Sequence, residues 1–215
     1  MPSKAPKSGI IECRPAQPED ASLASRLIFD TFPKMAAYIL GLGDDRRARR
    51  ILKKIFGTQG HRLSYEFAEM ICEDGNVVGI FIAYPGHELT RLGWRLGRLI
   101  LKAYPFAEKL KVIQRGLPLI FIQEAASDEY LLSNLGIKKS ARNRGIGTQV
   151  MPYIEEKARQ AGFHKLALMV NIDNRDAKWF YERHSFAVKA MHLEANSRIK
   201  HLGTGSLQMV KALLK

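Results

Sequence analysis

The sequence is poor in cysteine and has no long hydrophobic run. Its 215 residues include two cysteines, Cys13 and Cys72, too few for a disulfide framework or a paired-cysteine metal or redox site. We expect both to be buried free thiols. No uncharged apolar run approaches the roughly 18 residues that a membrane-spanning helix needs, and residues 1–9 lack the apolar segment of a signal peptide. We therefore expect a cytoplasmic protein.

Histidine and acidic residues are also scarce. The six histidines show neither metal-ligand spacing nor a serine–histidine arrangement, so we expect no metal site and no hydrolase site. The 21 acidic side chains are outnumbered by 34 lysines and arginines, which gives a formal net charge of +13. This excess is localised, because residues 44–62 and 88–115 each carry +5 and residues 138–144 carry +4. Any polyanion would therefore bind at particular segments.

Hydrophobic periodicity and turn residues predict a single domain over residues 1–215. Helices are predicted to begin at about 18–20 and to occupy 145–161 and 174–184. Short strands are predicted at 10–14, 65–72, 77–84, 130–137, 165–170, 187–193 and 206–213. This order predicts an α/β (α+β) fold, a single mixed, mostly antiparallel sheet flanked by helices, with a helical insertion between the third and fourth strands. The basic insertions, about 41–62 and 86–127, fit the alternation least.

The glycine-containing loop at 138–147 is the most informative segment. A predicted strand ends at Ile137, and the loop with Gly145 and Gly147 opens directly into a helix, so unpaired amides and the positive helix end meet at one place. Such a nest suits a phosphate group. The Walker motif is excluded because Thr148 follows Gly147 where that motif has lysine, and Val150 excludes the dinucleotide fingerprint. A glycine-rich turn with no ligand is the alternative.

Three patterns together resemble the GNAT superfamily of acyl-CoA N-acyltransferases. The first is Arg142-x-x-Gly145-x-Gly147, preceded by the aliphatic pair Leu135 and Ile137. The second is Asn174-x-x-Ala177-x-x-x-Tyr181, and the third is Ser185-Phe186, where the family usually has Gly-Phe. The specific resemblance covers about residues 130–186, and Arg14-x-Ala16-x-x-x-Asp20 extends it weakly upstream. It implies a GNAT-like fold and an acetyltransferase that uses acetyl-CoA as cosubstrate.

The resemblance also implies roles for individual residues. Tyr181 would protonate the departing CoA sulfur, and Asn174 would contact the pantetheine end or order the loop beside it. The remaining implied cofactor-binding residues pair with the pantetheine arm through their backbone (Leu135, Gly136, Ile137) or hold the pyrophosphate (Arg142, Asn143, Arg144, Gly145, Ile146, Gly147, Thr148). Ser185 and Pro152, which lies inside the predicted helix, depart from the family pattern without touching the phosphate loop.

The chemistry of a phenol fits the role implied for Tyr181. A tyrosine with a pKa near ~10 is protonated at neutral pH and can give its proton to a thiolate whose thiol titrates near ~8.5. The general base stays open, because five carboxylates near the strands are equally available as a base or as solvated surface groups: Glu66, Glu69, Glu124, Asp128 and Glu129. A core tyrosine with a satisfied hydroxyl is the alternative for Tyr181.

The acceptor and the basic segments are less constrained. We expect a primary amine, a small molecule rather than a protein, and the chain could act as a homodimer. Arg91, Arg95, Arg98 and Lys102 would form one stripe on a helix. That stripe could be a solvated face, a lid, a dimer contact, or a docking face for an acidic protein, nucleic acid or a membrane surface. A CoA-fold binding module that acts through these segments is the alternative to an enzyme.

Overall fold

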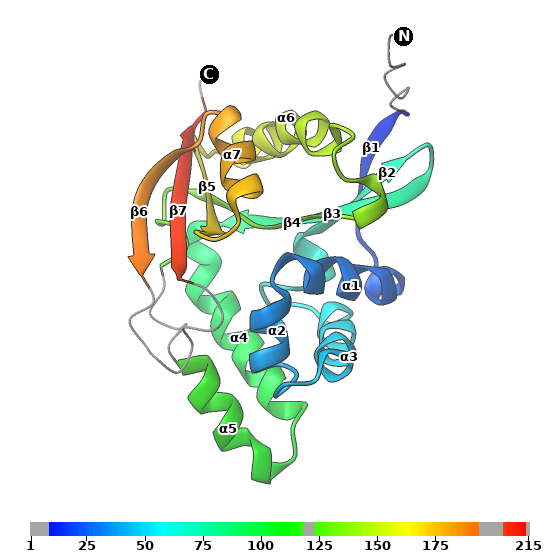
Figure 1. Cartoon of the computed structure of the whole chain (residues 1–215), viewed down its shortest axis with the longest axis vertical. Coiled ribbons are helices and arrows are strands. Elements are labelled where there is room, and N and C mark those ends of the chain that lie inside the picture. Colours follow the sequence, from blue (N-terminus) through cyan, green and yellow to red (C-terminus); the bar gives the residue numbers. More distant parts are fainter. Residues whose placement is uncertain (1–8, 118–122, 194–203, 214–215) are drawn as a thin grey trace.

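A seven-stranded mixed sheet runs through the computed structural model, which describes residues 9–117, 123–193 and 204–213 (Figure 1). Its order is β1-β2-β3-β4-β5-β7-β6, and every neighbouring pair is antiparallel except β4 and β5. The strands are β1 (Ile11–Pro15), β2 (Ala68–Glu73), β3 (Asn76–Pro85), β4 (Tyr130–Ile137), β5 (Lys165–Asn171), β6 (Ala187–Leu193) and β7 (Gly205–Ala212). Residues 1–8, which belong to the segment predicted to lack the apolar part of a signal peptide, lie outside the described residues.

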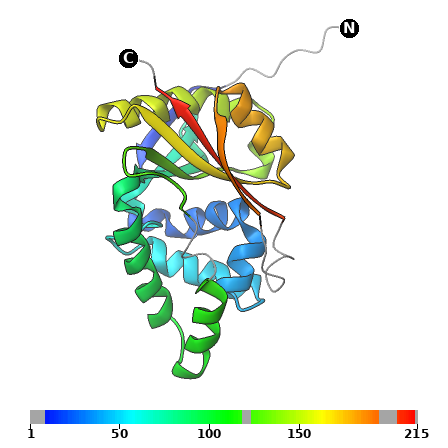
Figure 2. The ribbon, with the colours of Figure 1, turned by 90° about the vertical axis from the view of Figure 1, so that its left-hand side faces the viewer.

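Helices cover both faces of the sheet (Figures 1 and 2). One face carries α6 (Ile146–Gln160) and α7 (Arg175–Arg183). The other carries α1 (Ala21–Thr31), α2 (Pro33–Ile39), α3 (Asp45–Phe56), α4 (Leu89–Lys102) and α5 (Phe106–Gly116). The predicted fold class, a mixed and mostly antiparallel sheet flanked by helices, is confirmed. In the described part of the chain, no helix is long and apolar enough to cross a membrane.

The β2–β3 hairpin follows from its turn residues. Asp74 and Gly75 both have positive φ, 49° and 77°, which is the backbone of the tight turn that matches strand twist. The predicted start of β2 at residue 65 is wrong, because residues 65–67 form a 3₁₀ turn. Ser64 starts that turn by accepting a hydrogen bond from the Glu66 amide at 3.1 Å. Of the two predicted buried thiols, Cys72 is buried whereas Cys13 is only half-buried, and both are free.

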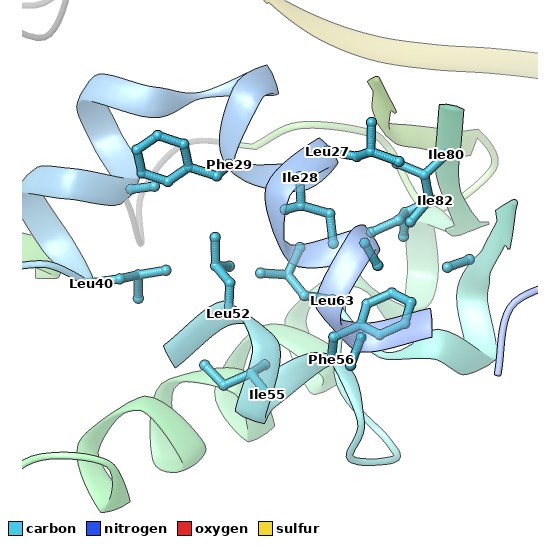
Figure 3. Close-up of a cluster of buried hydrophobic side chains, with 14 of the residues drawn as sticks. Leu27, Ile28, Phe29, Leu40, Leu52, Ile55, Phe56, Leu63, Ile80 and Ile82 are labelled. Atoms are coloured by element: carbon cyan, nitrogen blue, oxygen red, sulfur yellow. The ribbon is translucent and has the colours of Figure 1, made fainter. Parts of the chain in front are cut away.

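The larger core cluster lies between the sheet and helices α1 and α3 (Figure 3). Leu27 and Ile28 of α1 meet Ile80 and Ile82 of β3 from one side and Leu52 of α3 from the other. Residues 41–62, predicted as a basic insertion that fits the alternation of elements least, contribute the apolar side of α3 to this core. Helix α3 is amphipathic, so its leucine, isoleucine and phenylalanine side chains are buried while most of its arginines and lysines face solvent.

Helices α4 and α5 lie between β3 and β4 in the chain. They form a hairpin around Tyr104, which is buried and whose hydroxyl donates to the Leu40 carbonyl. Arg47 pairs with Glu108, which ties α5 to α3. The arginine stripe predicted on α4 is exposed on one side of that helix, and Leu92 is buried on the other. Part of the basic segment predicted at 86–127, residues 118–122, lies outside the described residues.

Candidate active site

The parallel strands β4 and β5 separate in the middle of the sheet. They pair only at Tyr130–Leu132 against Leu166–Leu168, although β4 continues to Ile137 and β5 to Asn171. The separation begins at a bulge in β4, since Ile82 of β3 pairs with Asn134 while Ala83 pairs with Leu132. Ser133 is the extra residue, and such a bulge re-aims a strand and ends regular pairing.

The predicted pantetheine residues lie on this open edge of β4. Leu135, Gly136 and Ile137 pair with β3 on one side, and the side toward β5 has no strand partner among the described residues. Backbone N–H and C=O groups on such an edge can bind an extended chain of amides, as a further strand would. Gly136 also permits close packing of α1, because a Cβ there would lie 3.0 Å from the Leu27 carbonyl oxygen.

The predicted phosphate loop forms a concave row of amides at the start of α6. Asn143 and Gly145 adopt left-handed backbone, with φ of 59° and 77°. In the described structure, the backbone N–H groups from Asn143 to Thr148 donate to no acceptor. The loop runs into the N-terminus of a 15-residue helix, where the helix dipole favours negative charge. The unbonded amides therefore fit an anionic group such as a pyrophosphate.

The two loop arginines already have protein partners. The Arg142 Nε atom donates to the Ile137 carbonyl oxygen at 3.0 Å, and Arg144 forms an ion pair with Glu73 at 2.6 Å. Both contacts hold the loop against the ends of β4 and β2. The Arg144 side chain is 36% exposed and Arg142 is also exposed, so both remain accessible to a ligand at the loop. The backbone amides are the better supported anion donors.

Helix α7 packs against the first turn of α6. A Cβ at Gly147 would lie 3.0 Å from the Phe180 ring, so only glycine allows this contact without a shift. His184 Nε2 lies 3.3 Å from Thr148 Oγ1, and a hollow of about 150 Å³ opens beside them against Trp179. Asn174 acts as the N-cap of α7, since its side chain accepts from the Ala177 amide at 3.2 Å. Its observed role is therefore to order the start of this helix.

Tyr181 is half-buried in the second core cluster. Its ring packs against Phe180 and Phe186, with centroid distances of 5.2 Å and 5.6 Å. No described residue hydrogen-bonds to its hydroxyl. Burial raises the pKa of Tyr181 to about 12, so the phenol is protonated at neutral pH.

Four of the five candidate base carboxylates have partners that do not reach the β4 bulge. Glu69 pairs with Lys157, Asp128 with Lys165, and Glu129 with Lys189. Glu66 accepts from the Gly60 amide at 2.5 Å. Each of these carboxylates therefore has a partner in the described structure, although the second carboxylate oxygen of the buried Glu69 has none among the described residues.

Glu124 differs because its partner reaches the β4 bulge. Arg62 Nη2 lies 2.5 Å from Glu124 Oε2 and 3.4 Å from Ser133 Oγ. The Tyr84 hydroxyl is fully buried beside the same groups, and burial raises its pKa. Asn134 completes the polar row by donating to Thr31 Oγ1 at 2.9 Å. Arg62, Tyr84 and Ser133 were missed in the sequence because no local motif links them.

The described residues contain no group of three or more side chains that could hold a metal ion. The site therefore consists of an open strand edge, an amide nest, a protonated phenol and a half-buried ion pair at the bulge. This combination suits an extended, phosphate-bearing cosubstrate that lies along the split in the sheet. An acyl-CoA is such a molecule, because it joins an amide chain to a pyrophosphate.

Comparisons with known proteins agree with this class. The sequence model of the acetyltransferase (GNAT) family matches residues 40–186, which is most of the chain. The chain therefore belongs to the GNAT acetyltransferase family, and it is an acetyl-CoA-dependent acyltransferase. Comparison with curated protein sequences gives no match.

Solved structures share the fold at low sequence identity. An N-acetyltransferase from Staphylococcus aureus Mu50 has a TM-score of 0.70 and 21% identity, covering 93% of this chain and 100% of that one. Another acetyltransferase has a TM-score of 0.69 and 21% identity, covering 94% and 100%. The ribosomal-protein-S18-alanine N-acetyltransferase from Escherichia coli has a TM-score of 0.52 and 12% identity, covering 96% of each chain.

Proposed function

We propose that this protein transfers an acetyl group from acetyl-CoA directly to a primary amine. The observation that carries the proposal is the row of unbonded amides from Asn143 to Thr148, at one end of the open edge of β4. One feature suits a pyrophosphate and the other an extended amide chain. When bound, acetyl-CoA supplies an activated thioester carbonyl.

Each predicted binding residue takes a part in this proposal. Leu135, Gly136 and Ile137 hold the pantetheine arm through their backbone, and the amides of residues 143–148 hold the pyrophosphate. Arg142 and Arg144 add positive charge beside the loop while they keep their contacts to Ile137 and Glu73. Asn174 acts indirectly, because it caps the helix that carries Tyr181. Direct contact of Asn174 with the cosubstrate is not needed.

Tyr181 is proposed as the general acid. It donates its phenolic proton to the CoA sulfur as the carbon–sulfur bond breaks, which avoids release of a free thiolate. A pKa of about 12 makes the phenol a weaker acid than an exposed tyrosine. The same burial disfavours a charged thiolate and so raises the pKa of the CoA thiol next to Tyr181. The pKa values of the phenol and the thiol therefore rise together.

Glu124 is proposed to receive the amine. A carboxylate next to the bulge attracts an ammonium group and accepts the proton that the nitrogen loses as the carbon–nitrogen bond forms. Neutralising a lysine-like amine at pH 7 costs about 4 to 5 kcal/mol, and a shielded site lowers this cost because burial disfavours the ammonium form. Arg62 orients the Glu124 carboxylate through their ion pair. Ser133 and Tyr84 supply further polar contacts at this end.

The acceptor is proposed to be a small primary amine in the cytoplasm. Only 22% of the Glu124 side chain is exposed, which favours a compact acceptor over a folded protein surface. The free thiols Cys13 and Cys72 are consistent with a reducing compartment.

The test is thiol release from acetyl-CoA in the presence of a panel of small amines, amino acids and peptides. We expect one class of amine to accelerate release, with intersecting initial-rate lines as direct transfer requires. A parallel-line pattern would indicate an acetylated enzyme and contradict direct transfer. Titration calorimetry with CoA serves as the activity-independent control, and a folded protein that binds no CoA would overturn the proposal.

A further inference from the structure

Helix α5 carries its apolar residues on the side that faces away from the protein. Phe106, Leu110, Ile113 and Leu117 follow one another at spacings of four, three and four residues, so they share one face of the helix. Their exposed fractions are 88%, 64%, 46% and 49%. These four residues are the α5 apolar stripe.

The opposite side of α5 makes the contacts with the rest of the molecule. Val112 is buried, and Glu108 pairs with Arg47 of α3. The Arg115 guanidinium lies 4.4 Å from the centre of the Tyr38 ring and donates to the Tyr38 carbonyl at 2.7 Å. At about 100° per residue, these three positions lie roughly opposite the stripe. A surface helix normally has the reverse pattern, with polar residues outward.

The α4–α5 hairpin that carries the stripe is rich in basic residues. Lys109 and Lys111 lie on α5 itself, and residues 88–115 carry a net charge of +5. The two acidic residues of this segment are both engaged, Glu88 with Arg91 and Glu108 with Arg47. The arginines and lysines therefore dominate the field at this end of the molecule.

Helix α4 repeats the combination of cations and an exposed ring. Trp94 is 62% exposed, and it lines a surface hollow together with Arg91, Arg95 and Arg98. Tryptophan beside basic residues is typical of helices that lie at a membrane surface. Leu92 on the other side of α4 anchors the helix in the core, so the outward face is presented by a fixed scaffold.

The position of α5 suits contact with a flat surface. Figures 1 and 2 both show α5 at the end of the molecule farthest from α6 and α7. A surface that touches α5 would leave the amide loop and the opening between β4 and β5 free.

We propose that the α4–α5 hairpin docks on an anionic lipid surface, with the α5 apolar stripe inserted among the acyl chains near the headgroups. A helix with a narrow exposed apolar face, on a hairpin whose other helix exposes arginines, matches this occupant in both shape and charge. A second copy of the chain is disfavoured because two segments of +5 would repel. Nucleic acid would leave the four apolar side chains unused.

The experiment is co-sedimentation of the full chain with vesicles of phosphatidylcholine alone or with 30% phosphatidylglycerol. We expect binding to the anionic vesicles, a loss of at least tenfold between 0.05 and 0.5 M salt, and little binding to neutral vesicles. Two exposed pairs are changed, Phe106→Ser with Leu110→Ser and Arg98→Glu with Lys102→Glu, and each should weaken binding at least tenfold.

Matched controls lie on other surfaces. Met191→Ser on β6 removes an apolar side chain that is 58% exposed, and Arg26→Glu on α1 reverses an exposed charge; both should bind vesicles normally. Failure to bind anionic vesicles overturns the proposal, and so does normal binding by the Phe106→Ser, Leu110→Ser variant, because attraction would then be charge alone. Concentration-dependent dimers that this variant abolishes, or an acidic protein that competes away vesicle binding, would assign the stripe to a protein partner instead.

Discussion

Replacement of Tyr181 by phenylalanine separates catalysis from folding. The ring packs between Phe180 and Phe186, and phenylalanine keeps these contacts. Because no described residue hydrogen-bonds to the Tyr181 hydroxyl, its removal breaks no protein contact. We therefore expect the free energy of unfolding to change by less than about 0.5 kcal/mol, and CoA affinity to stay the same.

The catalytic effect should be large. Loss of a positioned proton donor costs about 10²- to 10⁴-fold in kcat, which is roughly 3 to 5 kcal/mol of transition-state stabilisation. Tyr104→Phe is the matched control, because the buried Tyr104 hydroxyl donates to the Leu40 carbonyl far from the site. That variant should lose about 1 kcal/mol of stability and keep its kcat. Urea unfolding and initial-rate assays measure both quantities.

The pH profile adds a second check on Tyr181. Since burial raises its pKa to about 12, the phenol stays protonated up to pH 10. The rate should therefore rise with pH between 7 and 10 as an alkylammonium acceptor loses its proton, and Tyr181→Phe should keep this slope at a lower level. Unchanged kcat in Tyr181→Phe would refute the assignment, as would a wild-type rate that falls between pH 8 and 10.

Three further predictions concern other groups. Glu124→Gln should lower kcat/KM for the amine by about 10²-fold without changing CoA affinity, whereas Glu108→Gln at another arginine pair should change neither. Gly145→Ala and Gly162→Ala, at φ of 77° and 84° at opposite ends of α6, should each cost about 1 kcal/mol of stability, but only the first should weaken CoA binding, about fivefold by calorimetry. Burial lowers the pKa of His61 below 6.5, so urea unfolding should show stability falling as the pH drops below 6.5, and His61→Asn should flatten this dependence.

Local signals made residues 130–186 predictable. Strand β4 has the predicted bounds. Helix α6 begins directly after Gly145 and ends shortly before Gly162, and both glycines have the left-handed backbone that is common next to helix ends. The Asp74-Gly75 turn likewise made the β2–β3 hairpin predictable, because both residues adopt the positive φ that a tight turn needs. Each of these features depends on residues close together in the chain, so a pattern of neighbours is enough to predict it.

Long-range contacts account for what could not be predicted. The pairing of Arg62 with Glu124 joins residues that are 62 positions apart, and Ser133 enters only because β4 has a bulge. Net charge alone gave no sign that residues 41–62 contribute to the core, because that contribution depends on how charged and apolar residues are distributed around α3. The α5 apolar stripe points outward because the opposite face of α5 packs against the rest of the protein. Only the tertiary structure shows which face of the helix is packed.

The central claim is that the amides of residues 143–148 hold the phosphates of CoA. Hydrogen exchange of these amides, followed by NMR with and without saturating CoA, tests it directly and without an acceptor. They should exchange rapidly in the free protein, because no described group bonds to them, and at least tenfold more slowly with CoA. Gly162, at the far end of α6, should not change. Unaltered exchange across 143–148 at saturating CoA would contradict the account.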